Sequence, residues 1–465
     1  MLRGRAAACL AATFAITLSQ LAFAKSSLQG QVSASVGWTD NILSVPDVPT
    51  PPSTQVPQSD FYFQLRPSLI FTHGEARVVT RVSYTFNADL YATHSEANSY
   101  NHVVGLQSFF LTSKTTDLLL GASVSTGRLN SFNTAQGSGA TPIVLITPGG
   151  QNFVSATFNE QFGWDVSPRW RFLQSMGVTS YSPIDPHSTP DTVQVENHVV
   201  ADHGWRYDAL GIDLRTALSV VTELRGPSGA QLGDTSVSVS LPITDSLLSR
   251  RQLVLINGLT LKWRHDFGHF WATEADLGVV EANQLENRTT AIWKPAALAA
   301  IRYLHPYAQA ELNYTHNVQP NPIVAQTFEI NAVSLRLGVP LGRATNLLLS
   351  GSAGYQYSQT IDFDTGNTTS TAHSILVDGS LGWTPRPEIS LFLRYQLFDQ
   401  IGEPSDGTTG SVATQSLLRH TVMLGAIATW PAQSAATVPS REALRVDRAD
   451  AVTIPDQHSQ PQKSP

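Results

Sequence analysis

The sequence predicts an all-β fold, namely a transmembrane antiparallel up-and-down β-barrel of about 18 strands with short periplasmic turns and longer extracellular loops. Three observations predict it. Only 14% of the 465 residues are charged, well below the roughly 25% of an ordinary soluble domain. The apolar residues are dispersed rather than gathered into one long run. Polar and apolar residues alternate with period two over segments long enough to cross a bilayer at a tilt.

The first 24 residues predict a cleavable signal peptide. Two arginines precede a mostly apolar stretch over 6–21, and an Ala-Phe-Ala step ends at Ala24. This arrangement predicts cleavage between Ala24 and Lys25, and the alternative is a retained membrane anchor. Beyond residue 24 no run of 18 uncharged apolar residues occurs, which argues against a helical membrane protein. The single cysteine, Cys9, argues against a disulfide scaffold.

The clearest strand lies between residues 77 and 91, where apolar side chains occupy one parity and polar side chains the other. In lipid, one face of such a strand contacts acyl chains and the other contacts water. The same alternation defines the whole set of expected strands, which in chain order are 28–38, 60–72, 76–93, 99–113, 117–130, 151–165, 169–182, 192–206, 207–224, 251–266, 268–282, 288–304, 306–318, 327–340, 344–360, 371–384, 387–402 and 416–430.

The connections between these segments alternate in length. After each even-numbered segment the connection is short, and in two cases it is a single residue, Phe267 or His305. After odd-numbered segments it is longer, as in 39–59, 131–150, 225–250 and 403–415. Short periplasmic turns alternating with longer outer loops are typical of outer-membrane barrels. A soluble β-sandwich, the alternative all-β fold, does not require this asymmetry.

The last expected strand ends on an aromatic residue, Trp430, which is the terminal-strand aromatic that barrel-insertion machinery would read. The remaining segment, 431–465, is rich in Pro, Ser, Gln and charge, a composition typical of a disordered tail. The predicted organisation is therefore a signal peptide at 1–24, a barrel at 25–430 and a periplasmic tail at 431–465. Interfacial anchors are expected among the tryptophans near strand ends, although ordinary packing is an equal alternative; they are Trp38, Trp164, Trp170, Trp205, Trp263, Trp293 and Trp383.

The polar parity of the strands predicts the lining of a lumen. Its bases are Arg66, Arg77, Arg81, Arg171, Arg215, Lys262, Arg264, Lys294, Arg302, Arg336, Arg394 and Arg419. Its acids are Asp89, Glu196, Asp202, Asp213, Glu274, Asp276, Glu311 and Asp378. Two interpretations stay open. The charges either pair across strands and stiffen the wall, or the arginines form an entrance that gathers anions or sugar hydroxyl groups.

Catalytic patterns are weak in this sequence. Glu196, His198 and Asp202 share one strand face, but strand residues four apart lie over about 13 Å apart, too far for one metal ion or one catalytic triad. None of the common hydrolase, metalloprotease or phosphate-binding motifs occurs. We therefore expect no enzyme activity, no cofactor, no metal and no nucleic-acid partner.

The exit of the first strand, Gln31-Val-Ser-Ala-Ser-Val-Gly-Trp38-Thr-Asp40-Asn41-Ile-Leu, resembles the opening of a bacterial β-barrel porin family often found near exopolysaccharide genes. It is also similar to eighteen-stranded barrels that pair with periplasmic polysaccharide export proteins. The resemblance implies an exit conduit for a secreted polysaccharide in the outer membrane of a Gram-negative bacterium, in contact with lipid and lipopolysaccharide. A general or sugar-selective diffusion porin for small solutes is the alternative, and a barrel enzyme or adhesin is a third.

Overall fold

The structure is a computed structural model, and it describes residues 26–42, 56–75, 77–133, 144–184, 191–221, 252–268, 270–285, 291–305, 307–321, 326–341, 346–361, 363, 368–404 and 416–431. The predicted signal peptide at 1–24 lies outside these residues, as does the predicted tail apart from Pro431. Among the described residues, no helix has the length and apolar character needed to cross a membrane.

Alternating side chains with many β-branched and aromatic residues favour extended backbone, and the chain forms 18 strands with one short 3₁₀ helix, η1 (Ser95–Ala97). The strands are β1 (Ser26–Thr39), β2 (Asp60–Gly74), β3 (Val78–Tyr91), β4 (Ser99–Phe110), β5 (Thr116–Asn133), β6 (Val144–Asp165), β7 (Trp170–Pro183), β8 (Thr192–Gly204), β9 (Asp208–Val221), β10 (Gln252–Gly268), β11 (Trp271–Gln284), β12 (Ile292–His305), β13 (Ala308–Asn321), β14 (Gln326–Leu341), β15 (Leu347–Ile361), β16 (Thr368–Arg386), β17 (Ile389–Pro404) and β18 (Leu417–Trp430). Every predicted strand is present.

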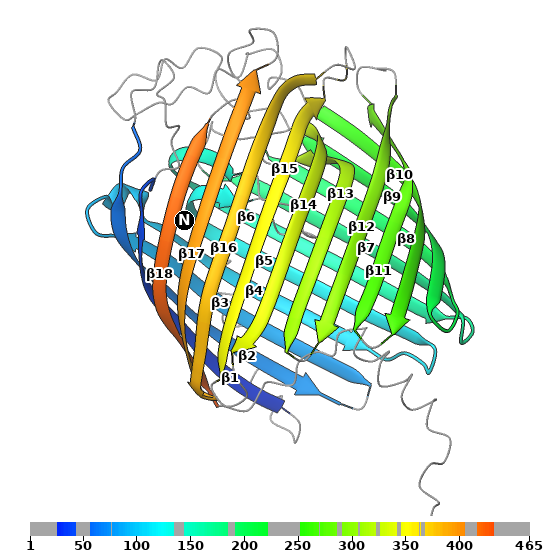
Figure 1. The fold of residues 1–465 in the computed structure, drawn as a ribbon, viewed down its shortest axis with the longest axis horizontal. Coiled ribbons are helices and arrows are strands. Elements are labelled where there is room, and N and C mark those ends of the chain that lie inside the picture. The colour runs from blue at the N-terminus through cyan, green and yellow to red at the C-terminus, as the bar shows by residue number, and fades with distance from the viewer. Residues whose placement is uncertain are drawn as a thin grey trace, which may run out of the picture.

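The strands close into one barrel (Figure 1). Each strand pairs antiparallel with its neighbours in the sequence, and β18 pairs antiparallel with β1 to close the ring. In that closing pair, Gly30 lies opposite Trp430 and Thr39 lies opposite Thr421. Closure satisfies every strand edge, which a sheet surrounded by lipid requires because no water is available there. The predicted fold class is confirmed.

One end of the barrel carries the short connections, for example 269–270 between β10 and β11 and 342–346 between β14 and β15. We call this the turn end and the opposite one the loop end. The first strand begins and the last strand ends at the turn end, since Ser26 lies opposite His73 and Gly30 opposite Trp430. By the rule for outer-membrane barrels, the turn end faces the periplasm.

Two predicted boundaries are wrong. β6 begins at Val144, not at 151, because the β5–β6 hairpin extends into the expected loop 131–150, where residues 131–133 pair with residues 144–146. Arg77 was expected on the wall, but it lies in the turn between β2 and β3, one residue before β3 begins. The alternation of polar and apolar residues in β3 continues back to Arg77 in the turn. Alternation alone therefore does not show where the strand begins.

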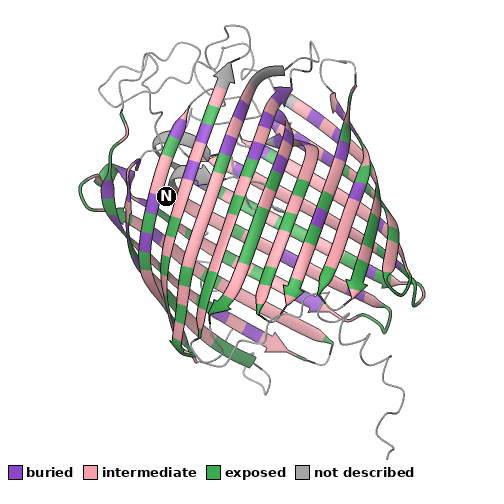
Figure 2. Ribbon diagram, in the orientation of Figure 1, coloured by how far each residue is buried: buried purple, intermediate pink, exposed green. Residues whose placement is uncertain are grey.

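Exposure alternates along the strands (Figure 2). Large apolar side chains stay exposed on one parity; Leu210, Ile212 and Leu214 of β9, for example, are 47–52% exposed. Because a water-soluble surface does not present apolar side chains from nearly every strand, this parity is the lipid-facing outer surface. Buried residues gather toward the loop end, where inward side chains such as Val254, Ile256 and Phe398 are at most 5% exposed.

Candidate functional site

The inner face of the barrel consists of the positions between the exposed apolar ones. Asp213 and Arg215 of β9 alternate with the outward leucines, and their side chains are only 18% and 19% exposed. The same alternation puts most of the predicted pore-lining bases on the inner face, namely Arg66, Arg81, Arg215, Lys262, Arg264, Lys294, Arg336, Arg394 and Arg419. Arg77 is the exception described above.

Many of the inner charges on β8 to β14 form ion pairs, most of which join neighbouring strands. We call this set the charge belt. Its members are Glu196 and His198 on β8, Asp213 and Arg215 on β9, Lys262 on β10, Glu274 and Asp276 on β11, Arg302 on β12, Glu311 on β13 and Arg336 on β14. Acids and bases alternate along it except on β11, where the acids Glu274 and Asp276 are adjacent and each pairs with a base on a different neighbouring strand.

The β8–β9 hairpin holds the first part of the charge belt. Arg215 Nη2 donates a hydrogen bond to Glu196 Oε1 at 3.2 Å. His198 lies between two carboxylates, with Nε2 3.9 Å from Glu196 Oε2 and Nδ1 3.7 Å from Asp213 Oδ1. Sequence reasoning paired His198 with residues of its own strand and missed Asp213. The short turn at 205–207 fixes the register of the hairpin, which puts Arg215 opposite His198. Counting residues from this turn would have indicated that the charges of β9 lie beside His198.

Lys262 bridges the next two strands. Its Nζ lies 4.0 Å from Asp213 Oδ2 and 3.8 Å from Asp276 Oδ2. Lys262 and Asp276 are directly opposite in the antiparallel register of β10 and β11, where cross-strand side chains are neighbours. One ammonium group therefore connects the carboxylates of two different strands.

Arg302 and Glu311 complete the charge belt. Arg302 Nη1 lies 3.3 Å from Glu274 Oε2, and its Nε donates a hydrogen bond to Glu311 Oε1 at 3.0 Å. Glu311 Oε2 in turn lies 3.9 Å from Arg336 Nη1. Because a guanidinium group has several donors in a fixed plane, it can serve carboxylates on both sides.

Further ion pairs lie outside the charge belt. Arg171 contacts Asp117 at 3.5 Å and Asp165 at 3.6 Å, and Arg394 Nε donates to Asp378 Oδ2 at 2.5 Å. Two more pairs join Lys294 Nζ to Glu329 Oε2 at 2.9 Å and His316 Nε2 to Glu329 Oε1 at 3.4 Å. These contacts favour pairing over an open arginine-rich entrance. Within the part of the chain that the structure describes, Arg66, Arg81 and Arg264 make no ion pair.

The inner face changes character at the loop end. There Ala217, Val254, Ile256, Val280, Ala282, Ala296, Val318 and Ile361 form one buried apolar cluster, with Phe363 packed against it. Beside it, Gln356, Ser374 and Gln400 lie opposite one another on β15, β16 and β17 and are at most 1% exposed. The inner face of β10–β14 is thus mainly charged toward the turn end and largely apolar and amide-rich toward the loop end, where Lys294, His316 and Glu329 also form ion pairs.

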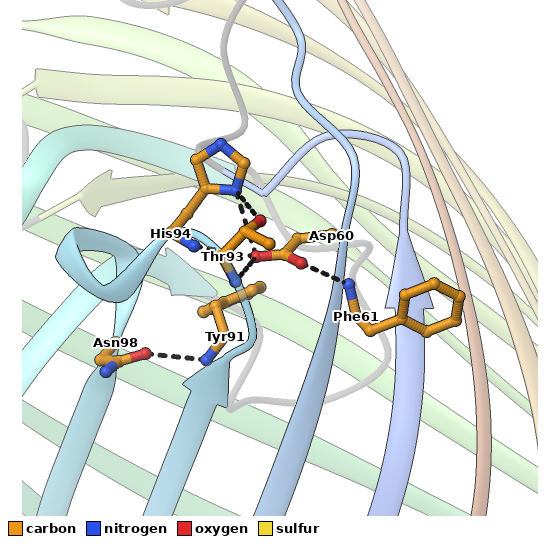
Figure 3. Close-up of polar contacts among 6 residues, drawn as sticks. All are labelled: Asp60, Phe61, Tyr91, Thr93, His94 and Asn98. Carbon is orange, nitrogen blue, oxygen red and sulfur yellow. Dashed lines mark hydrogen bonds and ion pairs between the residues drawn. The ribbon is translucent and has the colours of Figure 1, made fainter.

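A buried carboxylate braces the rim of the loop end (Figure 3). Asp60 Oδ2 accepts hydrogen bonds from the backbone N–H groups of Thr93 at 2.9 Å and His94 at 3.0 Å, and it lies 3.1 Å from His94 Nδ1. Asp60 Oδ1 accepts from the Phe61 N–H at 2.8 Å. The start of β2 therefore holds the β3–β4 connection, which otherwise would present several unsatisfied donors.

The outer face carries two aromatic bands at the levels expected for membrane interfaces. At the turn end the tryptophans are Trp164, Trp170, Trp205, Trp263, Trp271, Trp383 and Trp430, of which Trp430 is 75% exposed. Histidines lie among them; the His203 ring, for example, is 4.6 Å from the Trp170 ring and 4.5 Å from the Trp205 ring. Toward the loop end, Trp293 is 62% exposed. Aromatic rings at both borders of an apolar band anchor a barrel at the two lipid–water interfaces.

A closed antiparallel barrel with an apolar outer belt, aromatic borders and a polar inner wall defines the class. The chain is a transmembrane β-barrel of the outer-membrane type. Among the described residues, no group of three or more His, Cys, Asp or Glu side chains is placed to hold a metal ion.

Comparison with known proteins gives shape likeness only. No protein-family model matches the chain, and no curated protein matches its sequence. Solved structures with a similar outline include the FrpB iron transporter of Neisseria meningitidis, at 8% identity and a TM-score of 0.45 over 87% of this chain and 82% of that one. Another is OccAB3 of Acinetobacter baumannii, at 10% identity and a TM-score of 0.44 over 87% and 100% of the two chains. A third is the ferric enterobactin receptor mutant of Pseudomonas aeruginosa, at 8% identity and a TM-score of 0.46 over 88% and 81%.

Proposed function

We propose that the barrel is the outer-membrane exit conduit for a secreted polysaccharide and works with a periplasmic export protein. The observation that carries the proposal is the charge belt. Because its carboxylates and bases neutralise one another, the wall has few fixed charges free to trap an ion. Hydroxyl and amide groups between the pairs can exchange hydrogen bonds with a sugar chain at little net cost. Such a wall favours the passage of a neutral polysaccharide chain that moves along the lumen.

The segment 31–43 resembles the opening of porins associated with exopolysaccharide genes. This resemblance also favours a polysaccharide as the cargo. The turn end, where both chain termini of the barrel lie, is the side on which a periplasmic partner would dock. The predicted tail 431–465 leaves the barrel at this same end.

A diffusion porin for small sugars is the second candidate. The buried apolar cluster at the loop end, with Ile361 and Phe363 packed against the inner face of β9–β12, favours it because it narrows the passage for a chain more than for a single sugar.

Paired tryptophan substitutions test the proposal. β7 and β16 are nine positions apart in a ring of 18 strands, so the inner-face residues Gly177 and Ser380 lie on opposite sides of the lumen. A Cβ at Gly177 meets nothing within 4 Å, so the variant Gly177→Trp with Ser380→Trp should fold. The matched control, Val178→Trp with Leu381→Trp, places the same rings on the outer face.

In a strain lacking the gene, the wild type and the outward control should restore surface polysaccharide, as measured by lectin or dye staining, and the inward variant should restore several-fold less. Normal polysaccharide in the deletion strain would contradict export. If reconstituted vesicles then take up mono- and disaccharides through the wild type but not through the inward variant, the diffusion porin is the better assignment.

A further inference from the structure

The wall of the barrel is split at the loop end between β12 and β13. These strands pair from the turn end up to Ala297 and His316, which lie opposite each other. Beyond this pair, 292–296 of β12 and 317–321 of β13 are not paired with each other in the described part of the chain. Both segments keep their other neighbour, since β12 pairs with β11 and β13 with β14 along these residues. Closure of the ring thus leaves two strand edges free at this level.

The free part of β13 lies inside the barrel. Cα atoms of β13 come within 8 Å of Cα atoms of β10 and β11, although β10 and β13 are three positions apart in the ring and about 14 Å apart along a regular wall. Val318 of β13 belongs to the buried apolar cluster on the inner face of β9–β12. The loop end of the β13–β14 hairpin is therefore folded onto this inner face. We call residues 316–321 of β13 and the residues 326–331 of β14 that pair with them the inner tip.

The exposure of the hairpin changes where the inner tip begins. On its outer face, Tyr314 and Val333 are 39% and 42% exposed, as lipid-facing residues are. Farther toward the loop end the same parity is covered, since Val318 is 0% exposed and the side chains of His316 and Glu329 are 12% exposed. The face that contacts lipid below the split therefore contacts protein in the inner tip.

An ion pair joins the inner tip to the wall. Glu329 Oε2 of β14 lies 2.9 Å from Lys294 Nζ of β12, and Glu329 Oε1 lies 3.4 Å from His316 Nε2. Lys294 lies on the part of β12 that β13 has left, so the contact between Lys294 and Glu329 spans the split. We call this contact the latch. Because both side chains are largely covered, water and salt screen the latch less than an exposed ion pair.

The inner tip has packing of its own. Its two strands stay paired along their whole length. Phe328, Ile330 and Ala332 form an apolar cluster that is separate from the cluster on β9–β12. The inner tip can therefore move as one unit without losing its own pairing or this cluster.

We propose that the inner tip is a gate for the passage and that the latch holds it in a narrow state. In the wide state the tip swings back to the wall, where the free edge of β13 pairs with the free edge of β12. Packed sheets lie about 10 Å apart, so in the narrow state the tip takes roughly this depth from the lumen beside β10–β12. The latch and the burial of Val318 favour the narrow state, whereas pairing of the two free edges favours the wide one. Opposed contacts of this kind make an element bistable.

The level of the inner tip allows this movement. Val318 is eleven residues from Tyr307, which lies at the turn end, and this separation corresponds to about 28 Å along the barrel axis. The apolar belt of such a barrel is about 25 Å tall. In the wide state Glu329 and His316 would therefore face the polar side of the membrane interface and not hydrocarbon. The gate concerns the barrel whatever its cargo is.

Single-channel recording in planar bilayers tests the proposal. Glu329→Gln should raise the occupancy of a larger conductance state about tenfold, the effect of losing one charge-assisted hydrogen bond. Lys294→Gln removes a charge of the opposite sign and should raise this occupancy as well, whereas an effect of lumen charge alone would act in opposite directions. The matched control, Glu388→Gln in the turn between β16 and β17, should leave the occupancy unchanged.

Cross-linking tests the gate in the closing direction. The only cysteine is Cys9, in the predicted signal peptide, so cysteine pairs can be introduced into the barrel. Lys294→Cys with Glu329→Cys, joined by a reducible bis-maleimide, should lose the larger conductance state and regain it when the linker is reduced. The control joins the same strands below the split, through Ile301→Cys and Leu312→Cys, which lie opposite each other on the outer face, and should keep both states.

Labelling reports the movement directly. A water-soluble maleimide should react about tenfold faster with Ala296→Cys, in the buried cluster, when Glu329→Gln is added. Ala300→Cys is similarly buried on the same strand but lies outside that cluster, and its rate should not change. Folding of each variant is judged by heat-dependent mobility in gels. Unchanged occupancy in both folded latch variants, a larger state that survives cross-linking, or labelling of Ala296→Cys that Glu329→Gln does not accelerate would each overturn the proposal.

Discussion

Replacing Arg81, Arg215, Lys262 and Arg394 with glutamine should make the lumen cation-selective. The last three of these bases lie within 4.0 Å of carboxylates, so their removal exposes negative charges that are neutralised in the wild type. Glutamine keeps a similar length and hydrogen-bonding capacity. The fold should therefore survive while the electrostatic potential along the passage changes.

The size of the effect follows from the barrel geometry. A ring of 18 strands spaced about 4.8 Å apart and tilted about 40° has a radius of roughly 18 Å. Charged groups that reach about 7 Å inward lie about 11 Å from the axis, where each contributes about 0.4 kcal/mol in water. Four of them contribute about 1.5 kcal/mol, which screening at 0.1 M salt lowers to about 0.5 kcal/mol. Cations gain and anions lose about twofold in occupancy, so the permeability ratio should shift about fivefold.

Reversal potentials in planar bilayers under a salt gradient measure this ratio. At 1 M salt the screening length is about 3 Å, and the shift should fall below about 1.2-fold. A matched control adds Glu196→Gln, Asp213→Asn, Asp276→Asn and Asp378→Asn, which restores the charge balance and should restore the wild-type ratio. An unchanged ratio at 0.1 M salt in the folded fourfold variant would refute the placement of these bases along the passage.

Three further predictions concern processing and folding. Mass spectrometry of the protein from outer membranes should find cleavage between Ala24 and Lys25, and a chain that begins at Met1 would contradict the predicted signal peptide. Leu393→Arg should destabilise the barrel by about 2–4 kcal/mol in refolding titrations because it places a charge on the lipid face, whereas Gln396→Arg, on the inner face, should cost far less; equal losses would argue against this inside–outside assignment. Asp60→Ala should leave the Thr93 and His94 N–H groups unsatisfied at about 1–3 kcal/mol each, so hydrogen exchange should rise at 91–98 and stay unchanged at the turn end.

Much of the fold was predictable because lipid imposes a strict pattern. A strand with one face in hydrocarbon must alternate, and the alternation over 389–397 or 209–220 identifies both the strand and its outward side. The pattern is less informative about where a strand begins. β6 begins at Val144 because residues 144–146 pair with residues 131–133 of β5, and alternation along one strand does not report a contact between two strands.

The site was less predictable because its contacts join strands. Parity identified Lys262 and Asp276 as inner residues, but only the register shows that they lie opposite each other. At the loop end, parity predicted a wet lumen, whereas Val254 and Ile256 pack into an apolar cluster. The uninterrupted apolar run over 253–256 indicated this cluster, since a lipid-facing strand needs apolar residues on its outer face only.

The charge belt also bears on how the barrel selects its register. The outer apolar pattern forbids a slip of one residue, because that slip would turn every polar side chain into lipid. A slip of two residues keeps each side chain on its face, so the lipid pattern cannot exclude it. In the native register Glu311 lies directly opposite Arg302 on β12 and Arg336 on β14. A two-residue slip would place Glu311 against residues without charge on both sides and separate it from the guanidinium groups of Arg302 and Arg336. The inner ion pairs therefore favour the native register over a two-residue slip, which the lipid-facing pattern does not exclude.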